Sequence, residues 1–161
     1  MQTITSERNH PLENKIPPPL VCLITGAFMW GLSHMGPKVQ IDCEFTLVGS
    51  GGFVALGLFF LSAGFLSFRK AGTTIDPVQI DRASALVVGG IFRLTRNPMY
   101  VGFTSMLIAL AVALAAPFTL LGPLFFVVYI HRFQIVPEER ILIRKFGQLY
   151  GDYTKRVRRW I

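Results

Sequence analysis

Charged residues are missing from three long stretches of this sequence, at 16–37, 45–68 and 97–131. The stretches contain 22, 24 and 35 residues, and a helix needs about 20 apolar residues to cross the hydrocarbon core of a bilayer. Only 16% of the residues are charged, against roughly 25% in a soluble domain. These features predict an all-α integral membrane protein with a single domain over 1–161, too short for a separate soluble catalytic domain.

The third charge-free stretch is too long for a single span. As one helix it would measure about 50 Å, and Pro117 and Pro123 lie in its middle. We therefore predict a helical hairpin, although a re-entrant loop is an alternative because the second arm is short and Pro123 would kink it. The four predicted spans are 17–36, 46–68, 98–116 and 118–136.

The charges of the connecting segments predict the orientation. Segment 69–96 has five basic and two acidic residues, segment 132–161 has eight and three, and the loop around 38–44 is net negative. Since basic loops stay in the cytoplasm, both termini are expected there, in a bacterial inner membrane. The net charge of +7 then reports topology and not nucleic-acid binding. The polar first 15 residues lack the layout of a cleaved signal peptide.

The C-terminal region changes character after Pro137. This proline suits the first position of a helix, and apolar residues then recur every three or four positions. The pattern predicts one cytoplasmic amphipathic helix lying at the membrane interface. The basic ending KRVRRWI suits an anionic lipid surface, so membrane lipids are expected partners. The recurring apolar residues are Leu142, Phe146, Leu149 and Tyr153.

Candidate chemistry concentrates at the cytoplasmic ends of the last two arms. The spans themselves hold almost no ionisable group apart from His34 and His131, and such groups mark function inside a membrane. A hairpin would bring a cation, an amide, a phenol and a carboxylate to one cavity, which suits a polar, zwitterionic ligand. No metal site is expected. The four residues are Arg96, Asn97, Tyr100 and Glu138.

Three motifs occur in order along residues 71–161. They are an RxPxYxG motif from Arg96 to Gly102, an EE pair at Glu138 and Glu139, and FGxxYxxY from Phe146 to Tyr153. In this combination the region resembles the isoprenylcysteine carboxyl methyltransferase family, which is related to the phospholipid N-methyltransferases. The resemblance implies a membrane enzyme that transfers a methyl group from S-adenosylmethionine.

The resemblance also implies roles for individual residues. Glu138 would receive the amino group of the cofactor, and we assign Arg96 to its carboxylate. Arg132 and Gln134 lie nearest the position of a family arginine that serves the substrate carboxyl, so both are candidates for substrate binding, with Arg96 and Arg132 as the catalytic candidates. The cofactor-binding residues implied are Leu86, Val87, Phe92, Asn97, Pro98, Met99, Tyr100 and Glu138.

The predicted function is methyl transfer to a lipophilic or small membrane-partitioned acceptor, whose reacting group is a carboxylate, thiol or amine. The family usually has His at Asn97 and Tyr at Phe92, which leaves the prenylcysteine substrate open. One alternative is an NADPH-dependent membrane reductase with a related helical core, although an EE pair disfavours phosphate there. The other is a non-enzymatic membrane organiser whose basic tail binds lipid or a partner. The oligomeric state is not predicted.

Overall fold

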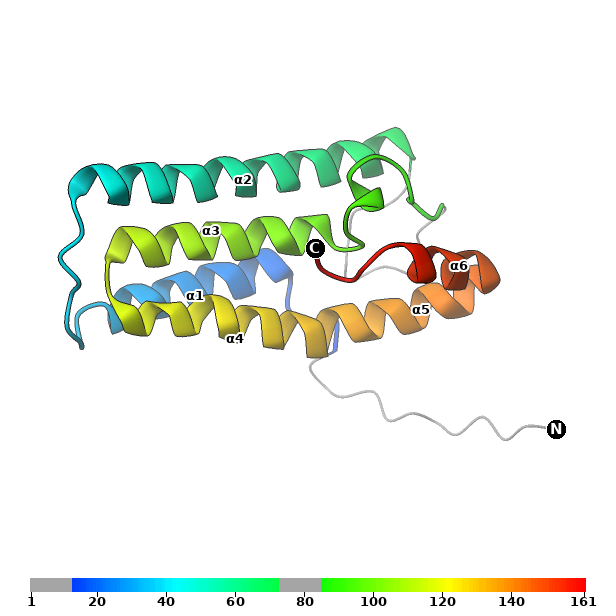
Figure 1. The fold of residues 1–161 in the computed structure, drawn as a ribbon. Helices are drawn as coiled ribbons and strands as arrows, with labels where there is room; N and C mark the ends of the chain where they lie inside the picture. Colours follow the sequence, from blue (N-terminus) through cyan, green and yellow to red (C-terminus); the bar gives the residue numbers. More distant parts are fainter. Residues whose placement is uncertain (1–12, 73–84) are drawn as a thin grey trace.

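The structure, a computed structural model, describes residues 13–72 and 85–161 (Figure 1). Every regular element in these two ranges is helical, which confirms the all-α prediction. Short 3₁₀ turns, η2 and η3, and a π-helical turn, η4, connect or extend the α-helices. The elements are α1 (Pro18–Leu32), α2 (Cys43–Lys70), η2 (Gly90–Arg93), α3 (Pro98–Leu114), η3 (Pro117–Leu120), α4 (Leu121–Ile130), η4 (His131–Ile135), α5 (Val136–Phe146) and α6 (Gln148–Arg156).

Helix α3 is the centre of the bundle. It packs along α2 on one side and against α1 and α4 on the other (Figure 1). Glycines permit the close approach of α2 and α3, because a Cβ built on Gly57 would lie 3.0 Å from the Gly102 carbonyl oxygen. Small residues at such contacts are typical of helices that pack in lipid. This close packing against α2 fixes the position of α3, and candidate residues lie at the start of α3.

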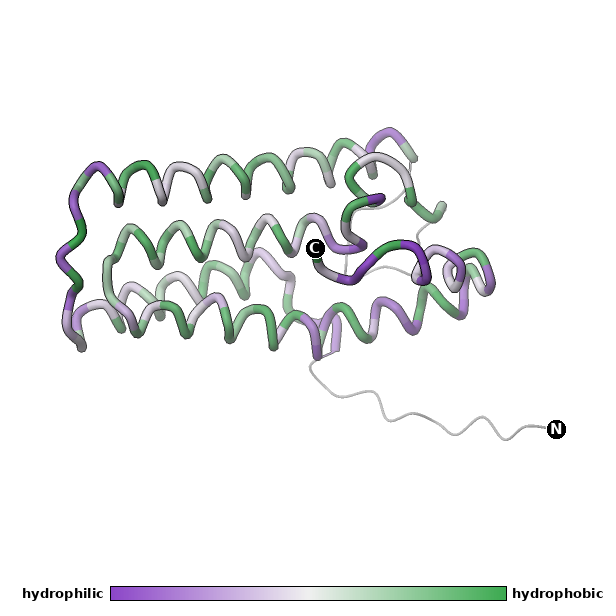
Figure 2. The backbone as a smooth tube through the Cα atoms, in the orientation of Figure 1, coloured by the Kyte–Doolittle hydropathy of each residue, from purple (hydrophilic) through white to green (hydrophobic). Residues whose placement is uncertain are grey.

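Two helical segments are long and apolar enough to cross a membrane. They are α2, with 28 residues, and the continuous run Pro117–Phe146, with 30. Helices α1 and α3 have 15 and 17 residues, or about 22 and 26 Å, less than the roughly 30 Å of a hydrocarbon core. Hydrophobic residues predominate in α1 to α4, and hydrophilic ones gather in the loop between α1 and α2, in α5 and near the C-terminus (Figure 2).

The predicted hairpin between the last two arms is present. Ala115 ends α3 in the left-handed conformation, with φ at 48°, and Pro117 begins the next turn. Helix α4 then returns beside α3 (Figure 1). Pro123 lies buried near the start of α4 and does not break it. The second arm is a continuous helix that extends beyond the predicted end at residue 136.

The expected helix is present as α5, with Pro137 in its first turn. Its expected separation from the last span was wrong, because the chain continues from α4 through η4 into α5 without a break. Pro137 has no amide hydrogen for the carbonyl of Phe133, one turn earlier. That carbonyl instead accepts a hydrogen bond from the Asn14 amide at 3.0 Å. The π-helical turn η4, where the chain takes one residue more than an α-turn, lies at this point. Such turns accommodate an interrupted hydrogen-bond ladder.

The single amphipathic helix predicted through Tyr153 was also wrong. Helix α5 ends at Gly147, which has φ at 52° and ψ at −123°. Residues with a Cβ atom rarely adopt this conformation. Helix α6 therefore starts in a new direction and folds back over the end of α5 (Figure 1). Its Tyr150 and Tyr153 are buried, whereas Leu149 is exposed, so the apolar period does not run across the glycine.

Candidate active site

The turn that precedes α3 builds one side of the site. Pro98 occupies the first turn of the helix and is fully buried, a position where its missing amide hydrogen costs nothing. Asn97 before it is non-helical, with φ at −129°, as steric contact with a following proline requires. Tyr100 then lies on the first turn of α3 and is 7% exposed, so its ring points into the protein.

Tyr100 and Glu138 form a buried pair between α3 and α5. The Tyr100 hydroxyl donates a hydrogen bond of 2.5 Å to Glu138 Oε1. Burial raises the pKa of Glu138 to about 8, and the hydrogen bond that the hydroxyl donates to the carboxylate offsets part of the cost of burying the charge. The pair therefore holds a carboxylate inside the protein at the point where the hairpin arms reach their polar end.

Glu139, the next residue, is surrounded by cations. Its Oε1 lies 3.1 Å from Arg96 Nη1 and accepts a hydrogen bond from Arg159 Nε at 2.9 Å. Its Oε2 lies 2.5 Å from Arg159 Nη2, and Arg159 Nη1 is 3.4 Å from His131 Nε2. The hydrogen bonds that Arg159 donates to Glu139 raise the pKa of Arg159 above its usual value. This network joins α5, the turn before α3 and the C-terminal segment.

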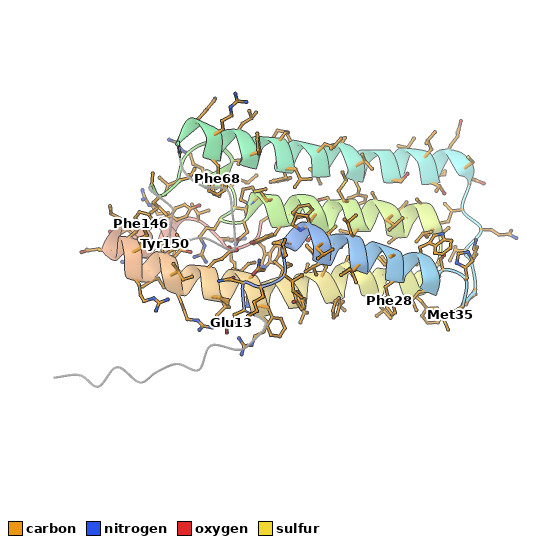
Figure 3. The ribbon with its side chains drawn as sticks, turned by 180° about the vertical axis from the view of Figure 1, so that it is seen from behind. Glu13, Phe28, Met35, Phe68, Phe146 and Tyr150 are labelled. Atoms are coloured by element: carbon orange, nitrogen blue, oxygen red, sulfur yellow. The ribbon has the colours of Figure 1, made fainter. Side chains whose placement is uncertain are left out.

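Helix α6 covers the same end with two tyrosines. Arg96 Nη1 donates to the Tyr150 hydroxyl at 3.4 Å, and the Tyr153 hydroxyl donates to the Phe92 carbonyl at 2.7 Å. Burial, followed by the charge of Glu139, raises the pKa of Tyr150 to about 12. Burial likewise raises the pKa of Tyr153, so both phenols stay protonated at neutral pH. Figure 3 shows Tyr150 at the same end of the bundle as Phe68 and Phe146.

Comparison with known proteins places the chain in a family. Residues 45–149 match the phospholipid methyltransferase family. The chain belongs to this family. The match covers nearly all of α2, the site residues up to Glu139 and the first residues of α6, and it confirms the resemblance predicted from the three motifs.

Two relatives extend the comparison. A protein-S-isoprenylcysteine O-methyltransferase from Schizosaccharomyces pombe is 28% identical over 126 residues, which are 75% of this chain and 52% of the yeast protein. The chain thus matches about half the length of that enzyme. An uncharacterized protein from Haemophilus influenzae is 38% identical over 63 residues, 39% of this chain and all of the relative. No solved structure matches the chain significantly.

The structure brings four predicted residues of this phospholipid methyltransferase family member to the same end of the bundle. Tyr100 contacts Glu138 as described, whereas Arg96 pairs with Glu139 and not with Glu138. The Asn97 side chain is engaged by the C-terminal segment, since its Nδ2 donates to the Arg159 carbonyl at 2.8 Å. The Tyr100 phenol and the Glu138 carboxylate are therefore in contact, as predicted. The Asn97 amide is hydrogen-bonded to the C-terminal segment instead.

The other predicted cofactor-binding residues lie in the segment before α3 and in the first turn of α3. Leu86 and Val87 are half-buried. Phe92 in η2 is buried and packs edge-to-face on Phe68 of α2, with ring centroids 5.2 Å apart. Met99 faces α2, because a Cβ on Gly64 would lie 2.9 Å from its side chain. Part of the segment that carries the resemblance, residues 73–84, lies outside the described residues.

The two predicted substrate residues lie on η4 but in different surroundings. The Arg132 side chain is 55% exposed, lies 3.6 Å from Glu13 and stands over the Phe133 ring. Gln134 is 1% exposed, and its Nε2 finds no hydrogen-bond partner among the described residues. Figure 3 shows Glu13 beside the junction of α4 and α5. Gln134 is thus inside the protein and Arg132 outside it.

Sequence reasoning missed Arg159, Tyr150 and the central place of Glu139. Arg159 lies in a run of basic residues, a pattern that indicates an exposed tail. Its contact with Glu139 spans 20 residues and depends on the reversal at Gly147. The glycine inside the apolar period was the one available signal for that reversal, since glycine commonly ends helices.

Proposed function

We propose that this phospholipid methyltransferase family member transfers a methyl group from S-adenosylmethionine to a lipophilic or small membrane-partitioned acceptor. One observation carries the proposal: a buried carboxylate, Glu138, and a buried guanidinium, Arg96, lie at the same end of the hairpin. Arg96 also donates a hydrogen bond to the Tyr150 hydroxyl, at 3.4 Å. A carboxylate and a guanidinium at one end of the bundle suit the ammonium and carboxylate of a zwitterionic amino acid.

The buried polar atoms of the site fit such a group. Arg96 Nε is buried and has no hydrogen-bond partner among the described residues. Because buried polar groups are nearly always paired, an unpaired cationic donor suits an anionic ligand atom. Glu138 has a second carboxylate oxygen, Oε2, beside the one that Tyr100 holds. We propose that Glu138 would hold the cofactor's amino group and that Arg96 would hold its carboxylate.

The neighbouring residues would enclose the rest of the cofactor. Phe92, Pro98 and Tyr100 are buried, and Leu86, Val87, Asn97 and Met99 are half-buried at the start of α3. The bound sulfonium supplies an activated methyl group, so the protein has mainly to align the acceptor and exclude water. For this, α6 covers the site with Tyr150 and Tyr153. A carboxylate or thiolate acceptor needs no strong base.

Gln134 is our candidate for contacting the acceptor. It lies one turn before Glu138 on the apolar side, and its buried amide nitrogen is an unused donor. A donor there can orient an acceptor oxygen that enters from the bilayer. A role of Arg132 in acceptor binding and catalysis stays a prediction. In that role Arg132 would leave its ion pair with Glu13 and bind an anionic group of the acceptor.

The placement in the membrane belongs to the same proposal. The two long apolar helices and the family support an integral membrane protein. We infer four spans, with α1 and α3 completing the bundle, and both termini on the cytoplasmic side of a bacterial inner membrane. The positive charge of segments 69–96 and 132–161 supports this orientation. The candidate site then opens at the cytoplasmic interface, where a water-soluble cofactor and a lipid-dissolved acceptor can meet.

The test is a calorimetric titration of detergent-purified protein with S-adenosylhomocysteine, with NADPH as the control ligand. We expect saturable binding of S-adenosylhomocysteine alone. Binding of NADPH alone would favour a membrane reductase, and binding of neither by folded protein would favour a non-enzymatic organiser. Transfer of label from S-adenosylmethionine into a membrane lipid extract would then identify the chemical class of the acceptor.

A further inference from the structure

The chain after α6, residues 157–161, folds back against the turn that begins α3 (Figure 1). We call these residues the C-terminal clasp. Two of its carbonyl oxygens accept hydrogen bonds from three consecutive residues of that turn, and one clasp side chain, Trp160, packs against the core. The bonds are Arg96 N to the Arg158 oxygen at 3.0 Å, Thr95 Oγ1 to the Arg159 oxygen at 3.2 Å and Asn97 Nδ2 to the Arg159 oxygen at 2.8 Å.

The clasp also supplies a side chain to the site. Arg159 engages both oxygens of Glu139, through Nε at 2.9 Å and through Nη2 at 2.5 Å. This two-point contact is the strongest arrangement that a guanidinium and a carboxylate form. Arg96 approaches the same carboxylate with one nitrogen, Nη1, at 3.1 Å. Glu139 is therefore shared unequally between the two arginines.

The unequal sharing leaves part of Arg96 free. Its Nε is buried without a hydrogen-bond partner among the described residues, and its side chain is 11% exposed. If Arg159 were absent, Glu139, which is 14% exposed, would lose its two-point partner. A buried carboxylate needs compensation, so the Arg96 guanidinium would turn toward Glu139 and bind it with two nitrogens.

We propose that Arg159 is a positioning residue: by holding Glu139, it keeps Arg96 available for an anionic group of the bound ligand. The inference rests on the proposed function, because the anion it assigns to Arg96 is the carboxylate of the methyl donor. Arg159 itself touches neither donor nor acceptor. Its effect is confined to the amino-acid end of the cofactor, which separates this role from a general contribution to folding.

The experiment compares two ligands in calorimetric titrations of the full-length protein in detergent. S-adenosylhomocysteine carries the amino-acid carboxylate, and 5′-methylthioadenosine has the same adenosine and thioether without it. Arg159→Ala should weaken S-adenosylhomocysteine binding by about tenfold or more, since a hydrogen bond to a charged group is lost. It should change 5′-methylthioadenosine binding by less than about twofold. Arg156→Ala, on the exposed surface of α6, removes the same charge and should leave both affinities unchanged.

A second variant tests the mechanism directly. In Arg159→Ala combined with Glu139→Gln, no carboxylate remains to draw Arg96 away, so S-adenosylhomocysteine affinity should recover toward the wild-type value. A purely structural role for Arg159 predicts that the double variant binds no better than the single one.

The outcomes separate this inference from the proposed function. Failure of the wild-type protein to bind S-adenosylhomocysteine would overturn both. Normal wild-type binding would overturn the positioning role alone if Arg159→Ala binds equally well, weakens both ligands to the same extent, or is not rescued by Glu139→Gln.

Discussion

Replacement of Glu138 by glutamine isolates the charge of the buried carboxylate. The amide oxygen of Glu138→Gln can still accept the hydrogen bond that Tyr100 donates at 2.5 Å, so the variant keeps the shape of the contact between α3 and α5. The change removes the negative charge that would bind the ammonium of the cofactor. Folding and ligand binding should therefore respond differently to one substitution.

The expected changes in ligand affinity and in folding stability can be estimated separately. Loss of a charge-assisted hydrogen bond costs about 1.5–3 kcal/mol, or about 10- to 150-fold in affinity for S-adenosylhomocysteine. The stability should change by less than about 1 kcal/mol, because burial raises the pKa of Glu138 to about 8 and the neutral amide replaces a carboxyl group that is already largely neutral near neutral pH. That corresponds to a shift of at most about 4 °C in apparent Tm for a chain of this size.

The assay pairs calorimetric titration with thermal unfolding in the same detergent. Glu44→Gln is the matched control, because Glu44 is exposed in the first turn of α2, at the other end of the bundle (Figure 1). It loses the same charge and should bind S-adenosylhomocysteine as the wild type does. Wild-type affinity in a folded Glu138→Gln protein would refute the assignment of Glu138 to the ammonium.

Three other substitutions test the packing and the electrostatics. Tyr100→Phe should lower the free energy of unfolding by about 1.5–3 kcal/mol, measured by denaturant titration, because the buried Glu138 carboxylate loses its hydroxyl donor. Gly102→Ala places a Cβ 2.7 Å from Leu61 Cγ and should lower stability by about 1–3 kcal/mol through overpacking, seen as a lower Tm. Burial raises the pKa of Tyr150 to about 12, above its unfolded value of about 10. The contribution of Tyr150 to the free energy of unfolding is therefore fully present below about pH 10 and is lost as the pH rises toward about 12. Tyr150→Phe lacks this titration, so it should unfold less readily than the wild type in that range, as measured by circular dichroism.

Controls for these substitutions lie in α2 and α4. A Cβ on Gly51 would meet nothing within 4 Å, so Gly51→Ala in α2 should be neutral or stabilising, as helix propensity favours alanine. The buried Tyr129 hydroxyl has no partner among the described residues, and Tyr129→Phe should not destabilise the protein. A loss of stability in Gly51→Ala equal to that in Gly102→Ala would argue against overpacking. An unchanged alkaline transition in Tyr150→Phe would contradict the raised pKa.

Local rules in the sequence were sufficient to predict the hairpin and its polar end. The length of the charge-free stretch and the position of Pro117 required a reversal, and Ala115 provides it in the left-handed conformation. Once the two arms are antiparallel, residues at the start of one face residues at the end of the other. The contact between Tyr100 and Glu138 follows from this geometry, and it was accessible without a structure.

The C-terminal part of the site could not be predicted in the same way. The apolar period from Leu142 to Tyr153 takes no account of Gly147, whose positive φ sends α6 back over the site. Arg159 reaches Glu139 only because of this reversal. A basic run in sequence gives no indication of which arginine will be half-buried, since that depends on contacts between residues 20 or more positions apart.

The π-helical turn His131–Ile135 has a consequence for how insertions and deletions would act on the protein. The turn adds one residue to the α-helical register, so every later side chain is rotated by about 100° relative to a regular continuation of α4. Glu138 takes the direction that residue 137, a proline, would otherwise occupy. Deleting one residue within the turn would therefore restore a regular helix and keep Glu138 facing Tyr100, whereas closing the turn into a regular α-helix without a deletion would point the uncharged ring of Pro137 there. The angular phase of this helix, more than its length, decides which group enters the site.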